Sequence, residues 1–284
     1  MAQLLNLKFF LYLCWLGVDG SPLEASRRNV SCNCKKTKRM IFGLFKSLDE
    51  KVEEDKETLI AKLKTSDILT LIIEMGNNNP ISKNIVKKQK RDMSFGSEDS
   101  TSWFAYRISD ELNDIKLKPE LLGLLNKKEF LQYKKYVLRC LSSLCVNCED
   151  YELFDLLMIE LKNNEDEELI TTVLSRLNKL KKPKSLNIDY LKDLLLKGNY
   201  QNRIDALNAL QNSEHKELEE ILIQEFNISD QHTKCMICST LRSTGTEKSL
   251  YILKAELKRT RSNDLKYFIE SAIEKINERI NSSS

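Results

Sequence analysis

Four of the eight cysteines form two pairs with the spacing that zinc ligands often use, Cys145-x-x-Cys148 and Cys235-x-x-Cys238. A structural zinc ion needs four such ligands, each about 2.3 Å from the metal. The two pairs fall on helices that the repeat pattern described below separates by three repeats, roughly 25–30 Å at the usual distance between packed helices. We therefore expect no shared metal and no cofactor, and we interpret these cysteines as small buried side chains.

Residues that carry acid–base or nucleophilic catalysis are sparse. The chain has two histidines, His215 and His232, and no glycine-rich phosphate loop, Gly-x-Ser-x-Gly turn or His-Glu-x-x-His motif. Asp189, Asp193 and Glu217 could line a groove, but carboxylates spaced like these are typical of a solvated helix face. The sequence therefore predicts that the protein is not an enzyme.

The composition is that of a helical protein with a solvated exterior. Among 284 residues there are only 8 Gly and 4 Pro, while 45 Lys and Arg nearly balance 42 Asp and Glu, for a net charge of +3. Few chain breakers and many straight-chain residues favour helices over strands. A near-balance of charge over the whole chain lacks the strong positive excess that typifies nucleic-acid binding.

The amino-terminal segment, residues 1–20, contains an apolar run at 9–18. Ten apolar residues are too few to span a bilayer but match the apolar core of a signal peptide. Cleavage there would make the protein secreted or envelope-associated. The alternative, an apolar helix docked on the rest of the chain, is the one we expect, with a cytoplasmic protein. A basic loop follows at 21–39, in which Cys32 and Cys34 are either free surface thiols or thiols activated by neighbouring cations.

Two further segments precede the regular part of the chain. Residues 40–76 show helical spacing of apolar residues and predict a helical amino-terminal region. Gly76 and Pro80 then mark a stop, because glycine is common just after a helix and proline cannot continue one. The polar and basic stretch that follows predicts a linker over 77–101.

From Trp103 the helical pattern becomes regular, and it repeats. Leu144, Leu177, Leu210, Leu241 and Ile273 recur at intervals of 31–33 residues. Two antiparallel helices cannot bury both of their apolar faces alone, whereas stacked copies of the pair can. The pattern predicts a first set of helices at 129–144, 168–180, 201–210, 231–241 and 264–276, and a second set between them at 151–161, 188–196, 217–226 and 248–257.

The last three repeats resemble a known family. Basic residues open equivalent helices at Arg203, Lys234 and Lys266, small and aliphatic residues follow at 206–210, and a Ser-Thr-Gly-Thr turn follows at 243–246. These features resemble the short HEAT-like repeats of the phycobilisome-lyase type, in a divergent form. The resemblance implies an all-α fold, an α-solenoid of two-helix repeats over 102–280. It also implies an interaction scaffold, since most members of the family have that role, while a few are enzymes or act on nucleic acid.

In solenoids of this kind the second helix of each pair lines the concave face. The predicted second helices are acidic over 149–162 and 214–225 and basic over 246–259, and their sum is negative. A groove for nucleic acid should be positive. The charge therefore favours a protein partner with basic stretches, bound without enzymatic activity. A lyase, a DNA glycosylase or a nucleic-acid-binding protein is the alternative, and membrane binding would have to use the amino-terminal segment. The partner-binding residues predicted from these charges are Glu217, Glu220, Lys254 and Lys258.

Overall fold

The computed structural model describes residues 46–94 and 96–282. This part of the chain is mostly helical. Within it there are fourteen α-helices and no strand. The chain divides into two units between Glu53 and Glu54, and the account below concerns the second. The helices are α3 (Leu48–Lys64), α4 (Ile68–Met75), α5 (Lys83–Asp92), α6 (Thr101–Ser109), α7 (Lys118–Leu125), α8 (Lys134–Asn147), α9 (Tyr151–Lys162), α10 (Glu167–Leu174), α11 (Asp189–Lys197), α12 (Tyr200–Ala209), α13 (Lys216–Ile228), α14 (Gln231–Thr244), α15 (Glu247–Arg259) and α16 (Asn263–Ser282).

Polar residues fix where many of these helices begin. A side-chain oxygen just before the first turn accepts hydrogen bonds from backbone N–H groups that have no partner within the helix. Asp150 does this for α9, Asp166 for α10, Asn199 for α12, Asp230 for α14 and Thr246 for α15. Because of these caps, the observed helices lie within a few residues of the predicted ones. The predicted helix at 168–180 is divided into α10 and a short 3₁₀ helix, Leu177–Lys179.

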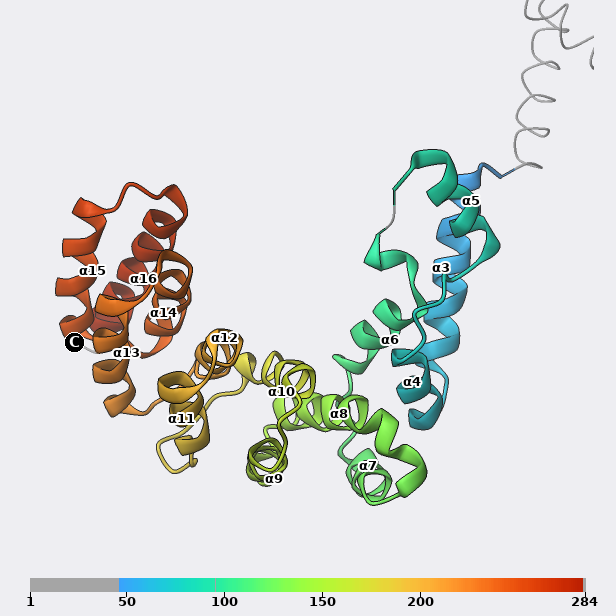
Figure 1. The fold of residues 1–284 in the computed structure, drawn as a ribbon, viewed down its shortest axis with the longest axis horizontal. Helices are drawn as coiled ribbons and strands as arrows, with labels where there is room; N and C mark the ends of the chain where they lie inside the picture. Colours follow the sequence, from blue (N-terminus) through green and yellow to red (C-terminus); the bar gives the residue numbers. More distant parts are fainter. Residues whose placement is uncertain (1–45, 95, 283–284) are drawn as a thin grey trace, which may run out of the picture. The chain divides into compact units, whose positions relative to one another are not determined.

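The even-numbered helices from α8 to α16 contact one another in sequence order, α8 with α10, α10 with α12, α12 with α14 and α14 with α16 (Figure 1). Hydrogen bonds join residues about one repeat apart along this row. The Thr240 hydroxyl donates to Leu207 O, 33 residues earlier, at 2.9 Å, and Arg139 Nη1 donates to Thr172 O, 33 residues later, at 3.1 Å. The periodicity in the sequence therefore corresponds to physical contact between successive helices.

The residues that mark the repeat occupy the core between these helices. Leu144, Leu177 and Leu210 are fully buried and Leu241 is 1% exposed. Ile273 is only partly buried, since α16 is the last described helix and no further helix covers it. Leu210 and Leu241 therefore both lie in the core.

From α11 onward, the close helix hairpins are formed by an odd-numbered helix and the even-numbered helix after it. α11 packs on α12, α13 on α14 and α15 on α16. Gly198 makes the first of these turns possible, because a Cβ there would lie 2.4 Å from Leu194 O. In this region the second helix of each predicted pair thus packs most closely on the first helix of the next pair.

The segment 77–101, predicted as a linker, contains helix α5. Ser82 caps this helix and Ile85 is fully buried. The Asp55 carboxylate accepts hydrogen bonds from Ser82 Oγ at 2.5 Å and Asn84 Nδ2 at 3.0 Å. One buried apolar residue among many lysines gives too little periodicity to reveal this helix in the sequence. The segments 1–20 and 21–39, with Cys32 and Cys34, lie outside the described residues.

Candidate functional site

Helices α9 and α11 form the walls of an open groove with a volume of about 450 Å³. Helix α9 buries Leu153, Phe154, Leu157 and Leu161 on one side. At this spacing one helix face is apolar, and the opposite face is left to solvent. On that opposite face lie Asp155, Ile159 and Lys162, which line the groove together with Met158.

Helix α11 supplies the facing wall through Asn187, Asp189, Tyr190 and Asp193. The Asn187 side chain accepts a hydrogen bond from Asp189 N and so orders the start of the helix. The Tyr190 hydroxyl donates to Leu161 O at 3.2 Å, across to the end of α9. This bond and the partial burial of Tyr190 fix an aromatic ring in the wall of the groove. The same burial raises the pKa of the Tyr190 hydroxyl.

The carboxylates of the groove are available to a partner. Asp155 is exposed and has no ion pair within the described part of the chain. Asp189 and Asp193 pair with lysines of their own helix, Lys192 and Lys197, each at 2.7 Å. The hydrogen bond from Lys197 lowers the pKa of Asp193, so this carboxylate is ionised at neutral pH. Exposed pairs of this kind contribute about 0–1 kcal/mol, so a cationic partner can replace them at little cost.

The groove also presents apolar surface. Ile159 is 61% exposed, while Met158 beneath it is 7% exposed. A long side chain that combines a methylene stem with a cationic head can cover such a surface and place its charge beside the carboxylates. The groove offers no histidine, cysteine, serine or threonine as a nucleophile or general base.

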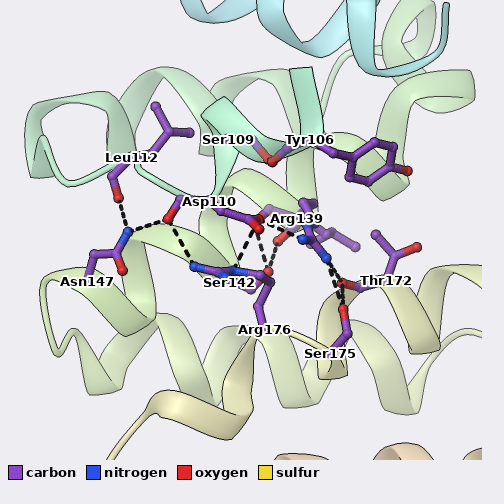
Figure 2. A network of polar contacts seen from close by, with 11 residues as sticks. Tyr106, Ser109, Asp110, Leu112, Arg139, Ser142, Asn147, Thr172, Ser175 and Arg176 are labelled. Carbon is purple, nitrogen blue, oxygen red and sulfur yellow. Dashed lines mark hydrogen bonds and ion pairs between the residues drawn. The ribbon is translucent and has the colours of Figure 1, made fainter. Parts of the chain in front are cut away.

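A polar network joins helices α6, α8 and α10 (Figure 2). Arg139 on α8 donates to the Asp110 carboxylate at 2.6 Å, to Thr172 O and to Ser175 Oγ at the end of α10. Arg176 donates to Asp110 O at 3.0 Å, and its Nε lies 3.4 Å from the same carboxylate. One carboxylate and two guanidinium groups thus join the end of α6 to α8 and α10. The sequence reasoning missed this cluster.

The four predicted partner-binding residues do not form a single cluster. Glu217 lies 3.2 Å from His215 Nδ1 and 3.8 Å from Lys192 Nζ on α11. Glu220 pairs with Lys248 on α15 at 2.9 Å. Lys254 and Lys258 are exposed on α15 and have no ion pair among the described residues.

Counting charges along the sequence overestimated the acidic surface of α13. Glu219 is 5% exposed, and its carboxylate accepts hydrogen bonds from Thr246 and Ser249, which cap the start of α15. Glu225 pairs with Arg203 on α12 at 2.5 Å. Both carboxylates hold helices together, so only Glu217 and Glu220 remain as exposed acidic residues within α13. Lys234 pairs with Glu256 in the same way, which explains why basic residues recur near the start of these helices.

The cysteines that suggested zinc are separate and largely buried. Burial raises the pKa of the Cys145 and Cys238 thiols to about 12. Cys148 donates to Asn113 O at 3.3 Å. Among the described residues, no group of three or more His, Cys, Asp or Glu side chains could hold a metal ion. In the same described residues, no helix is both long enough and apolar enough to cross a membrane.

Comparison with models of known protein families, with curated protein sequences and with solved structures found no match for this chain.

Proposed function

We propose that this protein is a non-enzymatic scaffold that binds a basic segment of another protein in the groove between α9 and α11. The observation that carries the proposal is the combination of the unpaired Asp155 with the exposed Ile159 on the same wall of that groove. Carboxylates attract the cationic heads of lysine or arginine, and Ile159 with Tyr190 offers a surface for their stems. A groove with charge and apolar surface in alternation favours a segment in which basic and apolar residues alternate.

The proposal includes the arrangement of the helices that present this groove. We propose that α8 to α16 form a HEAT-like α-solenoid, in which each helix packs on its equivalents one repeat before and after. The ordered contacts of the even-numbered helices and the hydrogen bonds between residues 31–37 apart support it. Repeats that contact only their neighbours provide an extended surface without a central active site, which suits a binding scaffold.

Charge attraction should dominate the rate of association, and the apolar contact should slow dissociation. The acidic side chains are solvent-exposed, so each contributes modestly, and several together are needed for measurable affinity. Binding should also weaken as salt screens the exposed charges.

The experiment is a titration of the protein against a short fluorescein-labelled peptide of alternating lysine and leucine, followed by fluorescence anisotropy. We expect Asp155→Asn combined with Asp193→Asn to weaken binding about tenfold, the effect of losing two exposed charge contacts of up to about 1 kcal/mol each. Glu152→Gln is the matched control, because Glu152 lies on the same helix, is exposed and does not line the groove.

The apolar contact is tested separately with Ile159→Ser, which should also weaken binding. Its control is Ile228→Ser, since Ile228 is 78% exposed on α13 and lies outside the groove. If the controls weaken binding as much as the groove variants do, the peptide is held by the overall charge of the surface and the proposal is wrong.

A further inference from the structure

A second, larger pocket lies where helices α12, α14 and α16 end, with a volume of about 720 Å³. It is lined by three cations, Arg242 from α14 and Lys275 and Arg279 from α16, and by one carboxylate, Glu278. Ionised side chains thus give this pocket a positive charge, opposite in sign to the groove between α9 and α11.

The wall of this pocket is fixed by Arg279. Its Nη1 donates to Arg242 O at 2.8 Å and its Nη2 donates to Gly245 O at 2.6 Å. These bonds tie α16 to the end of α14. Gly245 permits the close approach, because a Cβ there would lie 2.8 Å from Ile276 Cδ1. The pocket is therefore formed before any partner binds.

Two of the cations are able to pair with a ligand. Arg242 is exposed and forms no ion pair among the described residues. Lys275 pairs with Glu278 at 2.6 Å, but both side chains are about half exposed, so this pair is weak and readily exchanged. A guanidinium group presents a fork of N–H donors that matches a carboxylate in two parallel hydrogen bonds.

The remaining lining residues exclude some ligands. They are hydroxyl and amide side chains, Ser239, Ser243 and Ser282 with Gln211 and Asn212, and no aromatic or aliphatic side chain lines the pocket. A nucleotide base would find no ring to stack on, and a lipid chain would find no apolar surface. A polar, negatively charged ligand fits this lining.

We propose that this pocket is a second docking site, which binds an acidic segment of a partner protein through Arg242 and Lys275. The two cations belong to different helices, an arrangement that suits carboxylates spaced along a peptide. The site uses other helices than the α9–α11 groove and goes beyond the function proposed for that groove.

The test measures binding of a short fluorescein-labelled glutamate peptide by anisotropy at low salt. Arg242→Gln should weaken binding about three- to fivefold, the range for one exposed charge contact. The control is Arg261→Gln, which also removes one exposed guanidinium group without an ion pair in the described region but lies outside the pocket. Binding of the lysine–leucine peptide should be unchanged by Arg242→Gln, so the two sites can fail independently.

Three results would overturn the inference. The first is no measurable binding of the glutamate peptide, and the second is an equal loss in Arg242→Gln and Arg261→Gln. The third is displacement of the peptide by inorganic phosphate when chloride at the same ionic strength leaves it bound, because the pocket would then be a phosphate site.

Discussion

Two buried cationic sites stabilise neighbouring parts of this protein in different ways. At the end of α6, the guanidinium groups of Arg139 and Arg176 share the carboxylate of Asp110. After α10, the ammonium group of Lys182 is fully buried, and no carboxylate lies within ion-pair distance of it in the described chain. One site compensates buried charge with an opposite charge, and the other does so with dipoles alone.

The dipoles around Lys182 are backbone carbonyl groups. Its Nζ donates to Leu177 O, Leu180 O and Gln211 O at 2.7–2.8 Å. These oxygens come from the 3₁₀ helix after α10 and from the end of α12, so one side chain joins the ends of these two helices. Burial lowers the pKa of Lys182 to about 7, and the nearby Cys145 thiol opposes this shift weakly. The comparison teaches that a junction held only by dipoles depends on pH near neutrality, whereas one held by arginine and carboxylate does not.

The largest effect is expected from removing the shared carboxylate. Asp110→Asn leaves two largely buried guanidinium groups without an opposite charge, which should lower the free energy of unfolding by about 3 kcal/mol. Urea unfolding followed by circular dichroism measures this. Glu111→Gln is the control, because Glu111 is exposed in a pair with Lys64 and should change stability by less than about 0.5 kcal/mol. Similar stabilities of the two variants would mean that Asp110 does not compensate the arginines.

A smaller loss is expected at Lys182. Lys182→Met removes a desolvated charge, and this change stabilises the folded state. It also leaves three buried carbonyl oxygens without their donor, and this loss destabilises the folded state. The net loss should be about 2 kcal/mol, below that of Asp110→Asn. Lys181→Met is the neighbouring control, since Lys181 is 66% exposed in its pair with Glu214. A stability equal to or above that of the wild type would show that the carbonyl contacts do not offset the burial of the charge.

Counted per pH unit, the smallest effect is a dependence of stability on pH that should separate the two sites. The pKa of Lys182 is lowered to about 7 in the folded state from 10.5, so the unfolded chain binds more protons between these values. Stability should therefore rise with pH across this window, by at most about 1.4 kcal/mol per pH unit. Subtracting the profile of Lys182→Met from that of the wild type isolates this contribution.

The same subtraction with Asp110→Asn should give a flat difference in this window, because arginine stays charged throughout it. A flat difference for Lys182→Met as well would remove the contrast between the two sites.

Much of the helical fold could be predicted from the sequence, because local signals specify it. Caps such as Asn199 and Asp230, and a leucine repeated every 31–33 residues, locate helices and their shared core. Helix α5 was missed, because Ile85 alone among lysines gives no periodicity. The hairpin partners were also missed, since they depend on which turn is tight, as at Gly198.

The candidate site was harder to predict, because the identity of a charged residue does not show whether its side chain is buried or exposed. Glu219 and Glu225 counted as groove residues in the sequence, yet they cap α15 and pair with α12. Asp155 is likewise an acidic residue on a predicted second helix, but its side chain remains exposed. The difference arises from partners that lie about 22–30 residues away along the chain, which no local pattern reveals. The Asp110 cluster and Lys182 were missed for the same reason.

The central claim, that a basic segment binds between α9 and α11, is tested most directly by amide hydrogen exchange with and without the lysine–leucine peptide. The account predicts slower exchange in α9 and α11 when the peptide is bound, and unchanged exchange in α14 and α16. This pattern should disappear in the variant that combines Asp155→Asn with Asp193→Asn. Slower exchange in α14 and α16 instead, or equally in all helices, would contradict the claim.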